Sequence, residues 1–300
     1  MDLLVVSDCV LDVFMPASFP LKANSVVVAN SPCVISPGGS CYVAVTAKRL
    51  GLSVRVIDAF GEDWQARIIL DTLEREGVDV RYVTKNSTST CVVLLGKKRH
   101  SFVGTFGGGL EKIEHTKSVK SVFFSGYLLH PLNPNRVVLK HIQQAHEEGK
   151  IVFFDLAPVK TKKEELLSAL SVSDLVFANL REFYYARKIL GVHSDILKKK
   201  TVILKLGKEG CAIVQGENTK KFGALEVKKP VCDVGAGDVF DGAFIACHLK
   251  GLTLDECAIV ANTAAALKLE GIGIQSVPPR EAILHRLPRD IKNVRKLLEN

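Results

Sequence analysis

Residues 151–206, "IVFFDLAPVKTKKEELLSALSVSDLVFANLREFYYARKILGVHSDILKKKTVILKL", decide the fold class of this chain. They contain three short runs rich in Val, Ile, Leu and Phe, at 151–155, 174–178 and 201–206. Continuous apolar runs of this kind are typical of parallel strands that are buried on both faces. Helical patterns at 163–170 and 181–190 separate the runs. This alternation predicts an α/β fold with a parallel sheet and right-handed crossovers.

The same alternation extends through the N-terminal half of the chain. Apolar runs recur at 3–7, 54–60 and 121–127, and helical patterns recur at 40–50, 63–76 and 135–148. A length of 300 residues fits one large domain or two small ones. We expect a single domain over residues 1–300.

Two segments interrupt the alternation. Residues 13–36 contain Val-rich pieces around 25–29 and 33–36, and residues 89–106 resemble two strands around a G-K-K turn. These two insertions predict a small antiparallel sheet that stands off the main domain. A small sheet with one apolar face usually covers something. The small sheet could therefore be a lid over a ligand site, a homodimer contact, or both.

Composition limits the class of protein. Apolar residues make up 47% of the chain and charged residues 24%, as in soluble globular proteins. No apolar run reaches the roughly 18 residues of a membrane span, and aspartates interrupt the N-terminal apolar run that a secretory signal would need. The eight cysteines form no C-x-x-C zinc pair and are expected to be reduced thiols. We therefore expect a cytoplasmic protein without a membrane partner.

The formal net charge of +8 is spread over dispersed lysine clusters. A nucleic-acid binder would usually carry its basic residues on one element, with aromatic residues between them. We therefore expect solvated helix ends and turns, and no nucleic-acid partner. The positive field would still help to attract anionic ligands such as nucleotides.

A glycine-rich bend leads into a helical run in "CDVGAGDVFDGAF", residues 232–244. N–H groups in the first turn of a helix lack intrahelical partners, and the helix dipole is positive there. Gly235, Ala236 and Gly237 are thus a candidate phosphate cradle, because glycine lets an anion approach the backbone closely. Asp238 is placed to take a proton from a neighbouring hydroxyl, which suits phosphoryl transfer to an alcohol. An ordinary helix start explains the segment at least as well.

Other positions have both a ligand-binding and a structural interpretation. Asp12 follows a buried strand, where parallel sheets place ligand groups, or is a turn aspartate. Gly38 and Gly39 present N–H groups to hydroxyls, or form a loop-to-helix turn. Asn179 and Glu182 follow a predicted strand. Glu182 orders the waters of Mg²⁺, or the two residues cap a helix.

Six motifs, in order, resemble the ribokinase-like (PfkB) family of carbohydrate and nucleoside kinases along nearly the whole chain. They are "SDCVLD" (7–12), "PGGSCYVAVTAKRLG" with "VRVIDAFGED" (37–51 and 54–63), "NLRE" (179–182), "KLGKEG" (205–210), "GAGDVFDGAF" (235–244) and "ANTAAALKLEGIGIQSVP" (261–278). The resemblance implies a three-layer α/β/α fold with a mostly parallel central sheet and a small β-sheet lid. It also implies an ATP- and Mg²⁺-dependent kinase that phosphorylates a hydroxyl of a small sugar or polyol, or alternatively of a nucleoside.

The resemblance assigns roles to residues. It makes Asp238 the catalytic base beside the anion hole at 235–237, and it places Asp12, Gly38 and Gly39 at the acceptor. Glu182 would act on Mg²⁺ through water. The nucleotide would contact Asn179, Glu182, Lys205, Gly207, Gly210, Asn262 and Gly273.

The chain departs from the family pattern at several positions. Residues 40–45, SCYVAV, lack the asparagine that follows the double glycine, and DLAPV at 155–159 lacks the arginine of D-P-x-x-R. C-D-V replaces D-T-x before GAGD, in a segment that shapes a monovalent-cation loop in some members, so potassium dependence stays open.

Two functions of other classes were weighed. A non-catalytic ligand sensor on the same fold would have lost the base, whereas Asp238 is present. A nicotinamide-dependent dehydrogenase would need G-x-G-x-x-G directly after the first strand, where this chain has SDCVLD.

Overall fold

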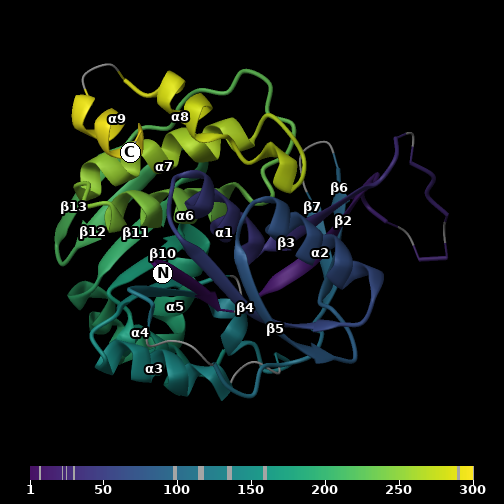
Figure 1. Ribbon diagram of the computed structural model, residues 1–300, viewed down its shortest axis with the longest axis horizontal. Helices are drawn as coiled ribbons and strands as arrows, with labels where there is room; N and C mark the ends of the chain where they lie inside the picture. Colours follow the sequence, from purple (N-terminus) through teal and green to yellow (C-terminus); the bar gives the residue numbers. More distant parts are fainter. Residues whose placement is uncertain are drawn as a thin grey trace.

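A nine-stranded sheet forms the centre of the described part of the chain (Figure 1). The structure is a computed structural model and describes residues 1–6, 8–21, 23–24, 26–29, 31–96, 100–113, 118–133, 137–157, 161–288 and 291–299. Across the sheet, the strands are β13 (Asn218–Phe222), β12 (Cys211–Gln215), β11 (Thr201–Lys205), β10 (Leu175–Asn179), β9 (Ile151–Asp155), β8 (Ser121–Ser125), β1 (Leu3–Val6), β4 (Val54–Gly61) and β5 (Asp79–Lys85). The strands from β11 to β5 are parallel, and β12 and β13 add an antiparallel edge.

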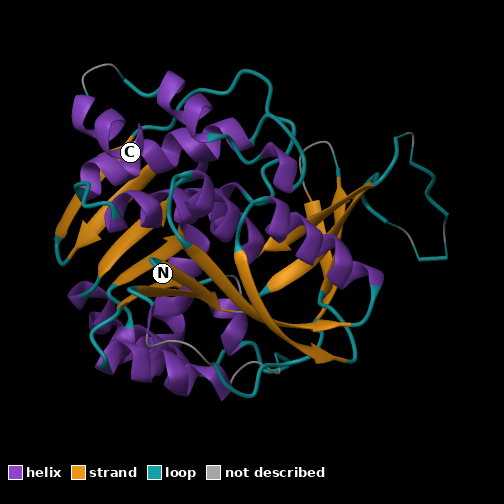
Figure 2. Cartoon of the chain, viewed as in Figure 1, coloured by secondary structure: helices purple, strands orange, loops and turns teal. Residues whose placement is uncertain are grey.

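Helices cover both faces of this sheet (Figure 2). One face carries α1 (Ser40–Arg49), α2 (Trp64–Arg75), α6 (Ala236–Leu249), α7 (Leu254–Lys268), α8 (Arg280–Arg286) and α9 (Lys292–Glu299). The other face carries α3 (Leu139–Glu147), α4 (Lys163–Val172) and α5 (Leu180–Leu190). Successive residues of β1 point into different cores, since Leu3 and Val5 join the first and Leu4 and Val6 the second. The predicted three-layer α/β/α fold is confirmed.

A second, four-stranded sheet stands beside the main one. Its order is β3 (Val34–Gly39), β2 (Cys9–Pro16), β6 (Thr90–Leu95) and β7 (His100–Thr105). Its inner face packs on the segment before the glycine bend, because Phe14 and Val93 form a cluster with Cys232. The two insertions thus meet in one sheet, close to the bend at 235–237.

The small sheet differs from the prediction in three ways. It is mixed, because β2 and β6 pair in parallel while β2–β3 and β6–β7 are antiparallel. Its first strand begins at Cys9 rather than near residue 13. The described residues of the Val-rich piece at 25–29 form no strand, and Val26 and Val28 are 91% and 83% exposed. Both edges of β2 are already paired, with β3 and β6, so these valines do not pair with β2. The predicted G-K-K turn includes residues 97–98, which lie outside the described residues.

Two element boundaries in the main domain also differ. The strand expected at 121–127 ends at Ser125, and a 3-10 turn, Gly126–Leu129, follows. The helix expected from residue 135 runs over Leu139–Glu147, and residues 134–136 lie outside the described part. In the described ranges, no helix has both the length and the apolar character needed to cross a membrane.

Candidate active site

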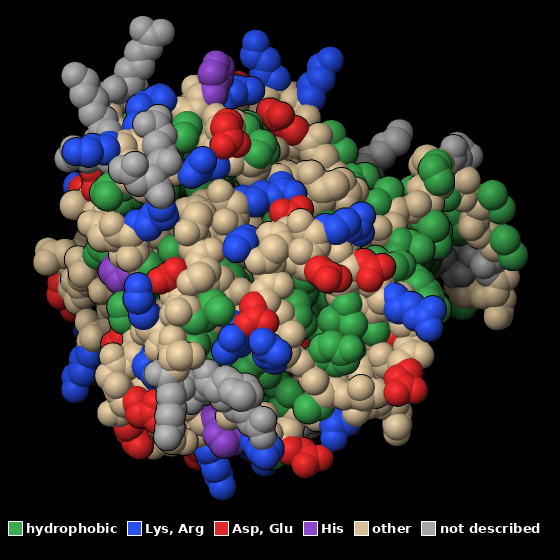
Figure 3. All heavy atoms as spheres, viewed as in Figure 1, with side chains coloured by type: hydrophobic (Ala, Val, Ile, Leu, Met, Phe, Trp, Pro, Cys, Tyr) green, Lys and Arg blue, Asp and Glu red, His purple; other side chains and the backbone are tan. Residues whose placement is uncertain are grey.

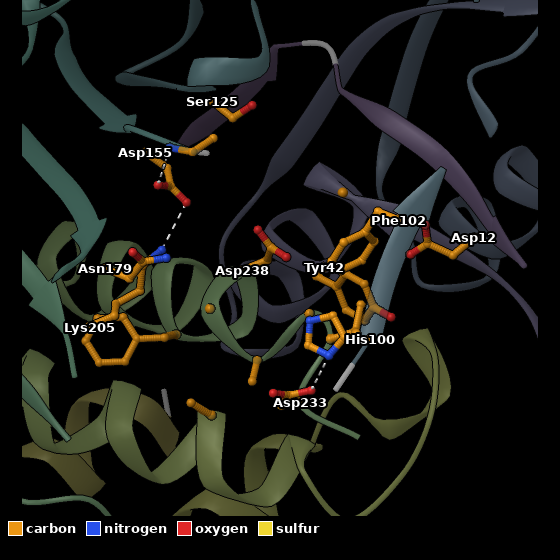
Figure 4. A pocket seen from close by; sticks show the side chains of 18 of the residues that line it. Asp12, Tyr42, His100, Phe102, Ser125, Asp155, Asn179, Lys205, Asp233 and Asp238 are labelled. Carbon is orange, nitrogen blue, oxygen red and sulfur yellow. Dashed lines mark hydrogen bonds and ion pairs between the residues drawn. The ribbon is translucent and has the colours of Figure 1, made fainter. Parts of the chain in front are cut away.

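A cavity of about 1250 Å³ lies between the carboxyl edge of the main sheet, the start of α6 and the small sheet. The last residues of four neighbouring strands line it: Ser125, Asp155, Asn179 and Lys205. Parallel strands end at the same edge of a sheet, so residues far apart in the sequence converge there. Figure 4 shows Asp238 between Asp155 and Lys205 on one side and Tyr42 and Asp12 on the other.

The glycine bend forms part of the cavity wall. Gly235 is the N-cap of α6 and has a φ of 84°, a left-handed conformation that favours glycine. A Cβ at this position would lie 2.6 Å from the Tyr42 ring, so no larger residue fits. Gly235, Ala236 and Gly237 all line the cavity. The backbone at the positive end of α6 is therefore open to an anionic ligand.

Asp238 lies in the first turn of α6 and lines the cavity. Burial raises the pKa of its carboxyl to about 6; Asp155 adds to this effect, while Lys205 and Lys268 oppose it. The carboxylate is thus a stronger base than an exposed aspartate and is still largely ionised at neutral pH. This pKa suits a group that accepts a proton near neutral pH.

Asp12 faces the same cavity from β2 of the small sheet. The sequence interpretation placed it just past the first strand of the main sheet, and that position belongs instead to Asp8, which accepts a hydrogen bond from the Ser125 hydroxyl at 2.7 Å. The backbone of Gly38 packs against the Asp12 carboxylate, because a Cβ on Gly38 would lie 2.0 Å from Asp12 Oδ2. Burial, together with Asp238, raises the pKa of Asp12 to about 7.

Gly38 and Gly39 differ in their position relative to the cavity. Gly39 lines the cavity at the N-cap of α1, with a φ of 57°. A Cβ there would lie 2.1 Å from the carbonyl oxygen of Asp8. Gly38 is not among the lining residues and supports Asp12 from behind. The absence of a side chain lets Gly38 approach the Asp12 carboxylate and lets Gly39 approach the Asp8 carbonyl.

Asn179 and Glu182 form a capping box at the start of α5. The Asn179 side chain accepts from the Glu182 N–H at 2.9 Å, and Glu182 Oε2 accepts from the Asn179 N–H at 2.7 Å. The helix-capping role that the sequence offered for this pair is therefore confirmed. Both residues also line the cavity, and burial with the charge of Asp155 raises the pKa of Glu182 to about 7.

Lys205 joins two carboxylates that the sequence analysis did not assign to the site. Its Nζ lies 3.0 Å from Asp155 Oδ2 and 2.9 Å from Asp241 Oδ2. Burial lowers the pKa of Lys205, but the charges of Asp155 and Asp241 outweigh this effect. The pKa of Lys205 is therefore well above its ordinary value. Carboxylate oxygens of Asp155, Asp238 and Asp241 lie within 4.8 Å of one another. Asp155 ends a predicted strand, and Asp241 is three residues from Asp238 on one helix face, so both signals were available.

The remaining predicted nucleotide positions divide into two groups. Gly207, Gly210 and Asn262 line the cavity. The Asn262 amide is already bonded to the carbonyls of Phe222 and Gly223, at 3.3 and 3.1 Å. Gly273 is not among the lining residues; a Cβ there would lie 2.8 Å from the Ser36 side chain.

The small sheet reaches the glycine bend across the mouth of the cavity. His100 of β7 lies with its Nδ1 3.4 Å from a carboxylate oxygen of Asp233, and its ring stands edge-on to Phe102 at 5.0 Å (Figure 4). Both rings line the cavity. Histidine and phenylalanine at these positions offer aromatic surface to a bound molecule.

Comparison with known proteins agrees with this geometry. The family model described as pfkB family carbohydrate kinase matches residues 2–281. The ATP-dependent 6-phosphofructokinase of Thermoanaerobacterium thermosaccharolyticum is 26% identical over 86% of this chain and 86% of its own. The nucleoside kinase of Methanothermobacter thermautotrophicus is 25% identical over 81% of each chain. A crystal structure of ribokinase from Cryptococcus neoformans in complex with ADP superposes with a TM-score of 0.82 and 19% identity, covering 95% of this chain and 99% of that one.

The match to the family model extends over almost the whole chain, and the motifs that carry it converge on one cavity with a basic carboxylate beside a glycine bend. The chain therefore belongs to the pfkB family of carbohydrate kinases, phosphotransferases that act on a hydroxyl acceptor.

Proposed function

We propose that this chain transfers the γ-phosphate of ATP to a hydroxyl of a small sugar or polyol. The observation that carries the proposal is the position of Asp238, a carboxylate with a pKa near 6 that faces the cavity next to the glycine bend. Asp238 would remove the hydroxyl proton as the oxygen attacks phosphorus in line. The N–H groups at 235–237 would stabilise the charge on the transferred group.

Acceptor and nucleotide would occupy different ends of the cavity. Asp12 and the backbone at Gly39 would hold acceptor hydroxyls below the small sheet, which acts as a lid. The nucleotide would lie along the 207–210 turn and α7, with its phosphates directed at α6. This arrangement brings the acceptor hydroxyl and the γ-phosphate together at Asp238.

The donor atoms at the strand ends suit Mg²⁺. Carboxylate oxygens of Asp155, at the end of β9, lie within 4.8 Å of those of Asp238 and Asp241 on α6. Magnesium takes one or two protein carboxylates while it keeps water and phosphate ligands. Glu182, through water, and Asp155 would hold the ion, which neutralises phosphate charge when bound. Lys205 keeps Asp155 and Asp241 in fixed positions through its two ion pairs.

A nucleoside is the alternative acceptor. Aromatic rings of His100 and Phe102 line the cavity on the side of the small sheet, and rings of this kind stack on bases. A coupled assay with ATP over sugars, polyols, sugar phosphates and nucleosides decides between them. We expect turnover with a sugar or polyol, and turnover confined to nucleosides would favour the alternative. Ligands that raise the melting temperature without any ADP release would favour a non-catalytic homologue.

We also propose that the small sheet mediates a homodimer. Apolar side chains gather on the sheet and its projecting loop (Figure 3), and Met15, Ile35 and Val103 are exposed. Covering such a patch is favourable in water. Light scattering at assay concentration should give twice the mass of one chain, and a monomeric mass would contradict the proposal. Free cysteines at all eight positions are consistent with a cytoplasmic location.

A further inference from the structure

Lys268 is a fully buried lysine beside the site, and the mechanism above does not use it. It is the last residue of α7 and has no exposed surface. Its Nζ donates to the Gly271 carbonyl at 3.3 Å and lies 5.7 Å from the centre of the Tyr42 ring. Among the residues that the structure describes, no carboxylate lies within ion-pair distance of it. Lysine is rarely buried without such a partner, because an ammonium loses much hydration there.

The ammonium lies behind the glycine bend. The Tyr42 ring on which it rests is the same ring that Gly235 touches. The N–H groups of Val231 and Cys232 donate to the carbonyl of Leu269, the residue that follows Lys268, at 2.7 and 3.3 Å. The end of α7 and the segment 231–235 are therefore one packed unit, with the Lys268 amino group inside it. Burial lowers the pKa of this group, and Cys232, Asp233, Asp238 and Asp12 oppose that effect.

The charge of Lys268 also acts on both carboxylates of the proposed reaction. It opposes the effect of burial on Asp12 and on Asp238, so that both ionise more readily. No other described cation has this effect on both residues, since Lys205 affects Asp238 alone. A fixed positive charge here also favours negative charge on a phosphoryl group at the bend.

We propose that the Lys268 ammonium is a built-in monovalent cation of this site, which positions the segment 231–235 and replaces a bound metal cation. The proposal rests on the proposed kinase function. The segment before GAGD is the one that the family resemblance connects with a monovalent cation. Cys232 and Asp233 of this segment are close enough for their charges to act on Lys268. A second cation beside the ammonium is disfavoured, because like charges repel.

The competing explanation is purely structural. A lysine at the end of a helix hydrogen-bonds the free carbonyls and complements the dipole. In that case substitution of Lys268 would lower stability, and added cations would restore neither the melting temperature nor turnover. A response that depends on the cation separates the two explanations.

The first test uses the unchanged protein. Turnover and melting temperature are measured in NaCl, KCl, NH4Cl and CsCl at equal ionic strength of about 0.1 M. We expect turnover to agree within about twofold and the melting temperature to be the same in all four salts, because the cation position is filled. Marked stimulation by K⁺ over Na⁺ would overturn the proposal.

The second test removes the charge. Lys268→Met keeps the length of the side chain, and we expect it to lose at least about tenfold in turnover. Lys268→Ala leaves space in which NH4⁺ or K⁺ should raise the melting temperature and turnover in a saturable way. Lys150→Met is the control for the loss of a mostly buried lysine. That side chain is only 9% exposed, lies 3.5 Å from Glu148, bonds the Val119 carbonyl and is away from the cavity.

Normal turnover of Lys268→Met, or a destabilised Lys268→Ala that responds to no cation, would contradict the proposal. If both variants fail to fold, the salt series on the unchanged protein still overturns the proposal when K⁺ stimulates turnover over Na⁺. The melting temperature separates this inference from the kinase proposal. A cation response of Lys268→Ala in a protein that phosphorylates nothing would support the cation site and refute the kinase function.

Discussion

Asp238 could act as the general base or only complement the dipole of α6, and one substitution distinguishes these two roles. Asp238→Asn keeps the shape of the helix start but cannot accept the hydroxyl proton. If Asp238 is the base, turnover should fall by about 10²–10⁴, with the nucleotide still bound. If it only complements the helix dipole, the variant should lose about 0.3–1 kcal/mol of stability and turn over almost normally.

Asp255→Asn is the control for this prediction. Asp255 occupies the first turn of α7, as Asp238 does in α6, but it does not line the cavity. Its substitution should lower stability slightly and leave turnover unchanged. Retention of more than about a tenth of the parent rate by Asp238→Asn would refute the assignment, since that loss is below the general-base range.

The pKa of Asp238 predicts a pH profile. If Asp238 is the base, its deprotonated carboxylate is the active form, so kcat/KM should fall as the pH drops through about 6 and level off above it. Asp12, with a pKa near 7, interacts with Asp238, so the profile will report both groups as a pair. Initial rates between about pH 5 and 8.5 test this. A flat profile would argue against an ionising base.

At the residue scale, sequence reasoning selected the glycine bend and Asp238, which do line the cavity, because their spacing carries local chemistry. The role of Asp238 as the base stays a prediction. Sequence reasoning did not assign Asp155 and Asp241 to the site. Their positions, at a strand end and on the helix face of Asp238, were visible in the sequence, but the Lys205 ion pairs that connect them form only after three elements converge. Sequence reasoning also noted that residues 40–45 lack the asparagine of the family pattern. The structure places Tyr42 at the cavity, with a buried hydroxyl that has no partner among the described residues.

At the element scale, α5 and α7 begin with the same capping box, and this offers an internal comparison. Glu182→Gln should raise the Mg²⁺ concentration needed for half-maximal rate, because the glutamine still accepts from Asn179 but holds magnesium-bound water less well. Glu256→Gln alters the equivalent box of α7, outside the cavity. It should leave the magnesium dependence unchanged.

Magnesium titrations of both variants, with melting temperatures, test this prediction. Equal magnesium dependence of Glu182→Gln and the parent would leave helix capping as the whole role of Glu182. A similar small fall in melting temperature in both variants is expected from the caps alone.

The main strands were predictable because each is a continuous apolar run buried on both faces. The small sheet was predicted with errors because strand propensity does not specify a partner. Val26 to Val28 have the composition of a strand, yet they are exposed and form no strand, while β2 pairs with β3 and β6. The parallel pairing of β2 with β6 depends on how two distant insertions meet, which no local pattern encodes.

For the whole molecule, the site reduces stability at neutral pH. Burial raises the pKa values of Asp12 and Glu182 to about 7 and that of Asp238 to about 6. The native state then binds more protons than the unfolded state between about pH 4 and 7, so the free energy of unfolding should fall as pH rises through this range.

Urea unfolding at about pH 5.5 and pH 8, without ligands, measures the effect, which we expect to be on the order of 1 kcal/mol or more. Asp12→Asn mimics the protonated carboxyl and should reduce the pH dependence. A protein that is more stable at pH 8 than at pH 5.5 would show that the buried carboxylates do not dominate.

The order of the two halves of the site along the chain has a consequence for biosynthesis. All four strands of the small sheet precede residue 106, whereas the glycine bend and Asp238 follow about 130 residues later. At usual rates of translation, the ribosome delivers the small sheet roughly ten seconds before the glycine bend. The core of the small sheet includes Cys232, so this sheet can pack completely only after the segment before the bend has been synthesised.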